Sequence, residues 1–229
     1  MDVAIIGGTG AEGFGLALRL AKAGHHVTIG SRSAEKGAGA AADAKAQLGG
    51  DAWVAGAENA DAARGKTVVA VTVPFGGMID IYKAIAPALD EGQVVFDATS
   101  PLMTSVGGKA WEAIRPWHGS AAEVAAALVP AGVKVVAGFH TIAAEALQAL
   151  DQPIESDALL CGDDAAAKVL IGELVTSIPG MRWVDCGPLP NARITETLTP
   201  LLISVNRKYK THEAGFRIVG RDAWGDPKG

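Results

Sequence analysis

Short apolar runs alternate with longer amphipathic stretches along almost the whole chain. The apolar runs predict strands near residues 2–7, 26–30, 52–55, 67–73, 93–97, 133–137, 157–161 and 181–185. The stretches between them predict helices near residues 11–23, 33–48, 58–64, 76–89, 120–128, 140–149, 163–177 and 189–208. This alternation is typical of an α/β fold with a mainly parallel sheet that helices cover on both faces.

The first strand leads into a glycine-rich turn, Gly8-Thr9-Gly10-Ala11-Glu12-Gly13, which fits G-x-G-x-x-G and opens the first helix. In this pattern Gly8 permits a tight turn, Gly10 lets a pyrophosphate approach the backbone, and Gly13 lets helix and strand pack closely. The phosphates then lie at the helix N-terminus. The context predicts a Rossmann-type, doubly wound domain that binds a dinucleotide. The alternative is a glycine-rich turn in a related domain that has lost its nucleotide.

The end of the second strand indicates which dinucleotide binds. NAD enzymes usually carry Asp or Glu there for the ribose 2′-hydroxyl, whereas this chain has Ser31 and Arg32, with Lys36 one helical turn later. A hydroxyl, a guanidinium and an ammonium group suit a 2′-phosphate, which a carboxylate would repel. We therefore expect NADP, although Arg32 and Lys36 are also compatible with an ordinary solvated helix start.

Two further strand ends are expected at the same edge of the sheet. Val73-Pro74-Phe75 follows the fourth strand, and Asp97-Ala98-Thr99 follows the fifth. They are equally compatible with a cofactor crevice and with ordinary turn chemistry around a buried aromatic residue. The long irregular connection 98–120 starts here, and such connections often cover ligand sites.

One histidine, His140, follows the sixth strand and is the site candidate among the five. A buried structural histidine, or a capping role for Thr141, explains this position equally well. His25 and His26 fit a turn, His118 fits the long connection and His212 fits the tail. The chain offers no defensible Ser/His/Asp set and no metal-ligand spacing. This favours hydride transfer between two ring cofactors, which requires stacking and orientation rather than a dedicated proton donor.

Composition narrows the class of protein further. The chain has 229 residues, 49% of them hydrophobic, and a net charge of −5 with scattered basic residues, which argues against nucleic-acid binding. It shows no apolar leader and no run long enough for a membrane span, so we expect a cytoplasmic protein without membrane contact. Cys161 and Cys186 lack metal or disulfide spacing and are expected to be buried, reduced thiols.

Several blocks of sequence resemble the NADPH-dependent reductases of the deazaflavin coenzyme F420. They are Gly7-Gly8-Thr9-Gly10-x-x-Gly13-x-Gly15-Leu16, Gly30-Ser31-Arg32-x-x-x-Lys36, Val73-Pro74-Phe75, His140-Thr141-Ile142, Cys161-Gly162-Asp163-Asp164, Asp185-x-Gly187-Pro188-Leu189 and Arg193-x-x-Glu196-x-Leu198-Thr199-Pro200-Leu201. The resemblance spans roughly residues 1–205.

The resemblance implies an NADP-binding Rossmann domain over residues 1–150 and a smaller C-terminal α/β part, 151–229, for substrate binding and dimerisation. It implies NADP and coenzyme F420 as the bound molecules, a homodimer, and no metal. It places Thr9, Gly10, Ala11 and Glu12 at the pyrophosphate; Ser31, Arg32 and Lys36 at the 2′-phosphate; Val73, Pro74 and Ala98 beside the nicotinamide; and His140 and Thr141 near the stacked rings.

The chain also departs from that family pattern. Ala11-Glu12 replaces the Asn-Leu pair typical of the turn, which brings a carboxylate close to the expected phosphates. The connection 98–119 and the tail beyond Arg207 are unfamiliar. An NADPH-dependent flavin or ferric-chelate reductase, and a non-catalytic NADP-sensing module, are therefore alternative functions.

The predicted helix 189–208 carries an apolar stripe that is expected to be core or dimer seam. The stripe consists of Ile194, Leu198, Leu201, Leu202 and Val205, and the basic segment 206–210 follows it. That basic end would either balance the helix C-terminus or meet the acidic tail of coenzyme F420.

Overall fold

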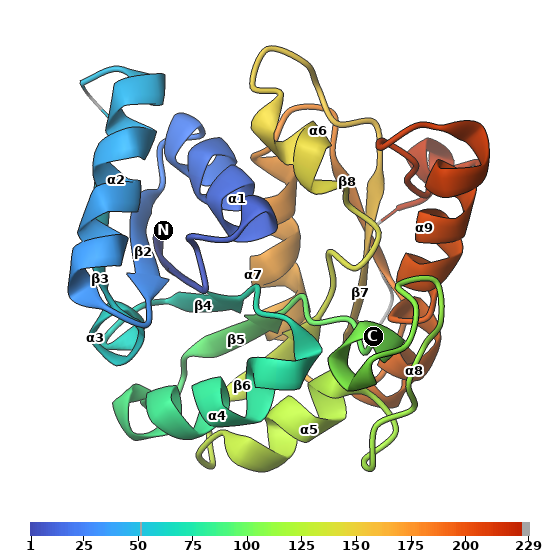
Figure 1. Cartoon of the computed structure of the whole chain (residues 1–229), viewed down its shortest axis with the longest axis horizontal. Helices are drawn as coiled ribbons and strands as arrows, with labels where there is room; N and C mark the ends of the chain where they lie inside the picture. Colours follow the sequence, from blue (N-terminus) through green and yellow to red (C-terminus); the bar gives the residue numbers. More distant parts are fainter. Residues whose placement is uncertain (51, 226–229) are drawn as a thin grey trace.

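Eight short strands form one twisted sheet at the centre of the molecule (Figure 1), in a computed structural model that describes residues 1–50 and 52–225. The strands are β1 (Asp2–Ile6), β2 (His26–Ser31), β3 (Val54–Glu58), β4 (Val68–Val71), β5 (Val94–Asp97), β6 (Lys134–Ala137), β7 (Asp157–Gly162) and β8 (Arg182–Asp185). Their order is β3-β2-β1-β4-β5-β6-β7-β8, and only β6 and β7 pair antiparallel. From β1, the strand order runs outward through β2 and β3 on one side and through β4 and the later strands on the other, as in a doubly wound fold. The predicted fold class and all eight strands are confirmed.

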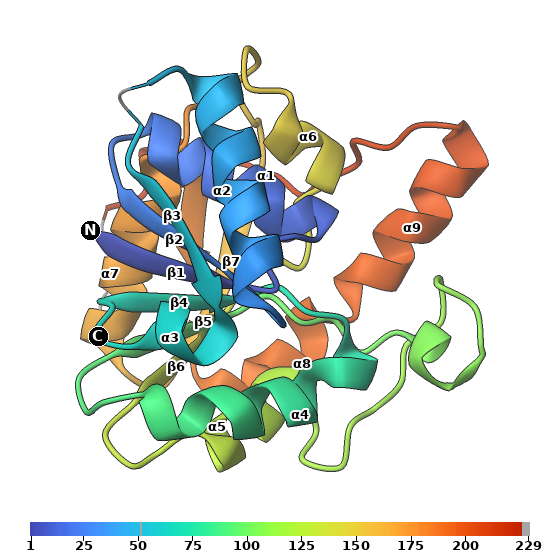
Figure 2. The same cartoon turned by 60° about the vertical axis from the view of Figure 1, so that its left-hand side comes forward.

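Nine helices cover the sheet and its edge. They are α1 (Ala11–Lys22), α2 (Ala34–Leu48), α3 (Asn59–Ala63), α4 (Phe75–Ile85), α5 (Ala121–Leu128), α6 (Ala144–Gln148), α7 (Ala165–Thr176), α8 (Ala192–Thr195) and α9 (Leu198–Tyr209), among the described residues. Buried side chains of α1, α2, α6 and α7 pack on one face, and those of α3, α4, α5 and α8 on the other. Figure 2 shows α1 and α2 above the strands and α4 and α5 below them.

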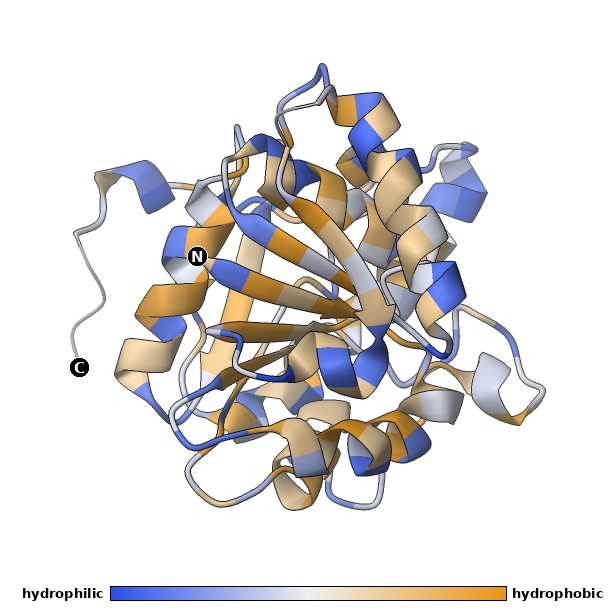
Figure 3. Ribbon diagram, turned by 90° about the vertical axis from the view of Figure 1, so that its left-hand side faces the viewer, coloured by the Kyte–Doolittle hydropathy of each residue, from blue (hydrophilic) through white to orange (hydrophobic). Residues whose placement is uncertain are grey.

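The strands are apolar along both faces, as expected for a sheet that is covered on both sides (Figure 3). Val3 and Ile5 of β1 join the core under α1, whereas Ala4 and Ile6 join the core above α4. None of the helices in the described part of the chain has the length and apolar character needed to cross a bilayer.

The predicted helix 189–208 is wrong as a single helix. The segment forms a 3₁₀ turn (Leu189–Asn191), the short α8 and the separate α9. Pro200 is the physical reason, because a proline inside a continuous helix clashes with the carbonyl four residues earlier but is tolerated in a first turn. The stripe is only partly core: Leu202 is buried, but Ile194 and Leu201 are 66% and 52% exposed.

Two other helices are shorter than predicted. The helix expected at 140–149 begins only at Ala144, because Phe139 adopts a left-handed backbone with a φ of 69° and His140 lies in the irregular turn that follows. The helix expected at 76–89 ends at Ile85 and continues as a 3₁₀ turn, Ala86–Ala88. Of the two cysteines, Cys161 is buried as predicted, whereas Cys186 is only half-buried; both are free thiols.

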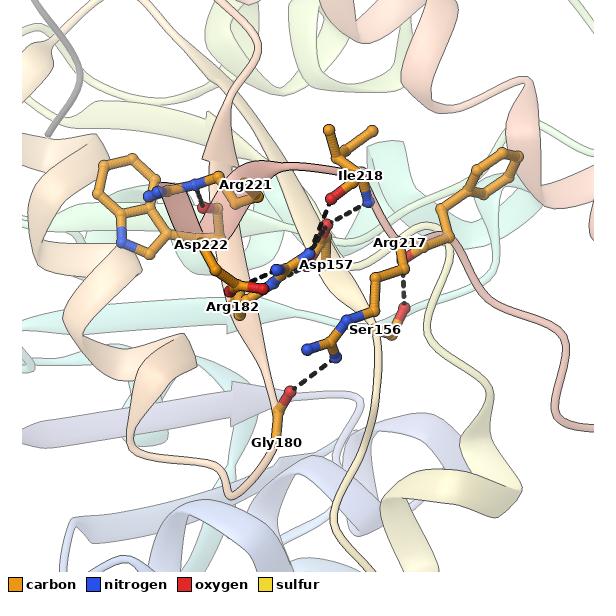
Figure 4. A network of polar contacts seen from close by, with 10 residues as sticks. Ser156, Asp157, Gly180, Arg182, Arg217, Ile218, Arg221 and Asp222 are labelled. Carbon is orange, nitrogen blue, oxygen red and sulfur yellow. Dashed lines mark hydrogen bonds and ion pairs between the residues drawn. The ribbon is translucent and has the colours of Figure 1, made fainter. Parts of the chain in front are cut away.

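The tail is fastened to the outer strands by a network of polar contacts around one buried ion pair (Figure 4). Arg182 of β8 donates two hydrogen bonds, of 2.7 and 2.8 Å, to the fully buried carboxylate of Asp157 on β7. The same guanidinium contacts Asp222 and the Ile218 carbonyl, and the Ile218 N–H donates to Asp157. The tail therefore packs along β7 and β8 as part of the folded structure.

The predicted boundary between residues 150 and 151 falls between α6 and β7. The division into two parts stays a prediction, and residues 226–229 of the second part lie outside the described residues.

Candidate active site

The glycine-rich turn after β1 has a backbone that only small residues can form. Gly7 has a φ of 76°, and a Cβ added there would lie 2.5 Å from Val73 Cγ1. A Cβ on Gly13 would lie 2.4 Å from Thr72 Oγ1, so the start of α1 rests directly on the β4 end. The close-packing role predicted for Gly13 is confirmed, but Gly7 rather than Gly8 supplies the left-handed residue.

The N-terminus of α1 is open to an anion. Gly10 is the N-cap, its backbone is extended, and it has no side chain that could occupy the first-turn N–H groups. A Cβ on Gly10 would meet nothing closer than the Gly7 carbonyl at 3.4 Å, so there is open space beside the N-cap, although the Gly10 N–H itself donates to the Gly7 carbonyl at 3.0 Å. Thr9 and Ala11 are exposed beside it.

Glu12, in the same turn, is half-buried. Burial, together with the nearby Asp97, raises the pKa of Glu12 to about 8. The carboxyl is therefore mainly a neutral acid at pH 7.

The end of β2 lies directly beside this turn, because the Gly8 N–H donates to the Gly30 carbonyl at 3.0 Å. Ser31 is buried, whereas Arg32 and Lys36 are exposed at the start of α2. Ser33 caps that helix through the Lys36 N–H at 3.3 Å. The three residues predicted for a 2′-phosphate thus share one corner with the glycine turn.

Sequence reasoning missed the polar group that supports this corner. Asn59, at the start of α3, is buried, and its side-chain oxygen accepts from the Gly7 N–H at 3.4 Å. Its position after an apolar strand is the only sequence signal that it offers.

The neighbouring ends of β4 and β5 form the next part of the edge. Val73 is half-buried, Pro74 is exposed at the N-cap of α4, and Ala98 is buried with its N–H on the Val71 carbonyl at 3.0 Å. These three residues, predicted beside a nicotinamide, come together at this edge.

Beneath them lies a buried network that was also missed. The Tyr82 hydroxyl donates to Asp97 at 2.5 Å, and the Thr99 N–H donates to the same carboxyl at 3.0 Å. Burial raises the pKa of Asp97 to about 6, although these hydrogen bonds act in the opposite direction. The pKa of Tyr82 also rises, because of its burial and the adjacent Asp97. The network holds the β5 end rigidly below Ala98.

His140 lies at the β6 end with no aligned hydrogen-bond partner on either ring nitrogen. Burial lowers the pKa of His140 to about 4, and the nearby Ala98 backbone offsets this only in part. The left-handed Phe139 before it packs edge-on against Phe96, with ring centroids 5.3 Å apart. A strained residue beside an unpaired, buried polar ring is the kind of arrangement that proteins keep at functional sites.

A cavity of about 640 Å³ opens beside His140 and Thr141. The turn that follows β6 forms one wall and α9 forms the other. Thr199, in the first turn of α9, joins the two because its hydroxyl donates to the His140 carbonyl at 2.6 Å. Its oxygen also lies 2.7 Å from Ser100 Oγ, after β5. Through Thr199, the cavity therefore adjoins the segment after β5 that carries Ala98 and Ser100.

The far end of this cavity is rich in basic side chains. Arg207, Lys210 and His212 line it from the end of α9, with Glu145 as the acidic residue of the lining. The Arg207 guanidinium also stacks on Trp111, 4.1 Å from the ring centroid, so the long connection 98–120 reaches the same region. Among the described residues, no group of three or more His, Cys, Asp or Glu side chains could hold a metal ion.

The Arg193-x-x-Glu196 motif supports the site from below rather than lining it. Arg193 pairs with Glu123 of α5, and the buried Glu196 carboxyl accepts from the N–H groups of Ala121 and Ala122 at 2.8 and 3.0 Å. Burial raises the pKa of Glu196 to about 8, despite these two hydrogen bonds.

Comparison with known proteins gives a consistent result. A family model described as NADP oxidoreductase coenzyme F420-dependent matches residues 2–101. Two similar proteins are the F420-dependent NADP reductases of Methanothermobacter marburgensis and Methanocaldococcus jannaschii, 44% and 41% identical; each alignment covers 96% of this chain and 98% of the relative. A crystal structure of an Arthrobacter protein proposed to be such a reductase has a TM-score of 0.80 and 29% identity, covering 96% of this chain and 99% of that one. A Streptomyces aurantiacus imine reductase, 19% identical with a TM-score of 0.56, covering 91% of this chain and 62% of that one, shares the fold alone.

Proposed function

The chain belongs to the family of F420-dependent NADP reductases, and from that premise we propose how its own residues hold the two cofactors for hydride transfer between NADP(H) and coenzyme F420. The observation that carries the proposal is the unpaired His140 beside the 640 Å³ cavity, at the sheet edge that also carries the glycine turn. A dinucleotide site and a second ring site are thereby adjacent.

The residues at and beside the glycine turn suit the binding of NADP. The exposed turn at Thr9, Gly10 and Ala11 suits a pyrophosphate, because first-turn N–H groups and the helix dipole favour an anion. The Ser31 hydroxyl with Arg32 and Lys36 suits the 2′-phosphate. A dinucleotide that extends from this corner along the strand ends would place its nicotinamide beside Val73, Pro74 and Ala98.

The cavity between the β6 turn and α9 fits coenzyme F420. His140 and Thr141 supply a polar wall for the deazaflavin, and the neutral His140 ring is able to donate or accept one hydrogen bond there. Arg207, Lys210 and His212 suit the anionic tail of the coenzyme, since they lie at the far end of the same cavity.

When both cofactors are bound, they supply the chemistry, because hydride passes directly between nicotinamide and deazaflavin. The protein holds the two rings in contact and excludes water between them. Such positioning alone supplies about 7–11 kcal/mol of the barrier reduction in well-oriented systems. No side-chain nucleophile is therefore needed.

We propose that the exposed apolar surface of α8 and α9 binds a second copy of this chain. Leu201 and Ile194 expose apolar surface on α9 and α8, and Trp117 is almost fully exposed on the adjoining connection. Burying these side chains in a homodimer would stabilise it by removing apolar area from water. A cytoplasmic location belongs to the same proposal.

The test mixes the purified protein with NADPH and coenzyme F420 and follows the loss of the deazaflavin absorbance. NADH, flavin mononucleotide and a ferric chelate run in parallel. Bleaching with NADPH and not with NADH supports the proposal. NADPH oxidation only with flavin or ferric chelate would assign a sister reductase. Binding of NADPH with every acceptor silent would assign a sensing module.

A further inference from the structure

The two cysteines lie side by side at the ends of β7 and β8, although they are far apart in the sequence. The parallel pairing places Leu160 opposite Asp185, and Cys161 and Cys186 come next in the two segments. The Cys186 N–H donates to the Leu160 carbonyl at 2.8 Å, so the ladder continues to this position. Neighbouring strands lie about 4.8 Å apart, and disulfides join Cα atoms about 4.4–6.8 Å apart. The backbone therefore has the spacing that a disulfide needs.

Both cysteine side chains lie on the same face of the sheet. Cys161 is fully buried in the core on the side of α4 and α5, and Cys186 packs against the same core. The two thiols are free, and their side chains share a hydrogen bond. A pair of free thiols in direct contact needs only the loss of two hydrogen atoms to become a disulfide.

The two thiols differ in access and in acidity. Cys186 is half-buried, whereas Cys161 is enclosed. The hydrogen bond with Cys161 lowers the pKa of Cys186, although burial and Asp185 act in the opposite direction. The same hydrogen bond, together with burial, raises the pKa of Cys161. Because the thiolate is the nucleophile, Cys186 is the sulfur that meets an oxidant first, and Cys161 is the resolving thiol beside it.

A buried lysine supports the reactivity of this pair. The Lys168 ammonium group donates to Asp185 at 2.7 Å and to the Gly187 carbonyl at 3.4 Å, so it contacts the residues on both sides of Cys186. Its positive charge favours the thiolate form of both cysteines. A cationic neighbour and partial exposure are features of reactive cysteines, whereas buried structural cysteines are inert.

We propose that Cys161 and Cys186 form a redox-active pair, which hydrogen peroxide oxidises to an intramolecular disulfide and which a thiol reductant restores. The Cys186 sulfur attacks one peroxide oxygen, the O–O bond breaks, and a sulfenic acid and one water form. The Cys161 sulfur then attacks the Cys186 sulfur, the S–O bond breaks, and the S–S bond and a second water form. Two electrons pass from the sulfurs to the peroxide, and the two thiol protons leave in the waters.

The experiment treats the reduced, folded protein with hydrogen peroxide and maps the products. Remaining thiols are blocked with iodoacetamide during unfolding, and the protein is digested with trypsin without reductant. Trypsin leaves the two cysteines in separate peptides, residues 135–168 and 183–193, so only a disulfide joins these peptides. We expect the joined peptides and the loss of both free thiols. Dithiothreitol added to the oxidised native protein should restore both thiols.

Single variants test the order of attack, and each serves as the control for the other because the chain has two cysteines. Cys161→Ser leaves Cys186 without a resolving partner, so dimedone should trap a sulfenic acid at Cys186. Cys186→Ser leaves only the enclosed thiol, and dimedone should label Cys161 far more slowly. Equal labelling in the two variants would overturn the assigned order of attack.

The wild-type peptide map decides the proposal even where a variant does not fold. Free thiols after peroxide treatment, sulfonic acids without joined peptides, or a disulfide between two chains would overturn it. Closure only after unfolding in urea, or loss of the far-UV circular dichroism on closure, would also overturn it, since the native strands would then lack the required spacing. The experiment contains neither cofactor, so failure of the proposed hydride transfer leaves its result unchanged.

Discussion

His140 pays a desolvation cost that a bound molecule can relieve. The ring is 6% exposed, and neither nitrogen has an aligned partner. Burying an unpaired polar group is unfavourable, so such a residue persists where function requires it. At the scale of single residues, the site is built from buried groups with shifted pKa values and from exposed cationic side chains.

The state of His140 can be tested directly. We expect its imidazole to titrate near pH 4, because burial disfavours the charged form. This stabilises the native state above the unfolded-state pKa of about 6.5, and the contribution is lost as pH falls through 4. NMR titration of the five histidines checks it, with His140→Gln identifying the signal. A His140 signal that titrates near 6.5 would contradict the expectation.

Arg32 should decide the choice between NADP and NAD. Arg32→Ala is expected to raise the KM for NADPH about ten- to a hundredfold, because a hydrogen bond to a charged group contributes about 1.5–3 kcal/mol. The KM for NADH should not rise. Lys45→Ala, at the other end of the same helix, serves as the control and should change neither value. Equal losses for both cofactors would place the 2′-phosphate elsewhere.

At the scale of elements, long-range polar contacts hold together pieces that are too short to be stable alone. α5 has eight residues and α8 has four. Isolated helices of this length are marginal in water, so their stability comes from packing and from contacts such as those of Glu196 with the start of α5. The tail depends in the same way on Arg182.

Arg182→Lys should release the tail from β7 and β8. Lysine keeps the charge but lacks the planar fork that meets both oxygens of Asp157, and it also cannot reach Asp222 and the Ile218 carbonyl together. We expect faster hydrogen exchange at the Ile218 amide and faster tryptic cleavage after Arg217 and Arg221.

Arg64→Lys is the matched control, since the pair of Arg64 with Asp61 is exposed and contributes little. Equal protection of the tail in Arg182→Lys and wild type would show that its other contacts, such as that of the Asp157 N–H with the Phe216 carbonyl, suffice to hold it.

At the scale of the whole molecule, three carboxyl groups are held with raised pKa values near one edge of the sheet. Burial raises the pKa of Asp97 to about 6 and those of Glu12 and Glu196 to about 8. The native state therefore keeps protons that the unfolded chain, with values near 4, gives up. Stability contributed by these groups is complete below pH 4 and is lost as pH rises to about 8.

We expect the free energy of unfolding without ligand to be lower at pH 9 than at pH 6.5. Urea unfolding at the two pH values measures the difference. Glu196→Gln should reduce it, although this variant starts from lower stability because an amide oxygen cannot accept both α5 N–H groups as the carboxyl does. Higher stability at pH 9 than at pH 6.5 would contradict the raised values.

Local sequence patterns predicted most of the strands and helices of the fold. β1 and the turn after it are recognisable because apolar runs and glycine spacing act over a few neighbouring residues. The same local logic failed at 189–208, where helical periodicity was given more weight than Pro200. It also failed at Phe139, whose left-handed backbone has no sequence signature.

The sequence by itself determined the α/β class, the eight strands, the glycine turn and the basic corner of Ser31, Arg32 and Lys36, since each depends on residues close together in the chain. Only the tertiary structure decided that Asp97 is among the causes that raise the pKa of Glu12, that Thr199 bonds the His140 carbonyl, and that α9 lines a cavity. These contacts join segments far apart in sequence, and their geometry depends on how the strands order themselves in the sheet. The ionisation states followed from that burial, because a pKa depends on the surroundings of a group and not on its neighbours in the chain.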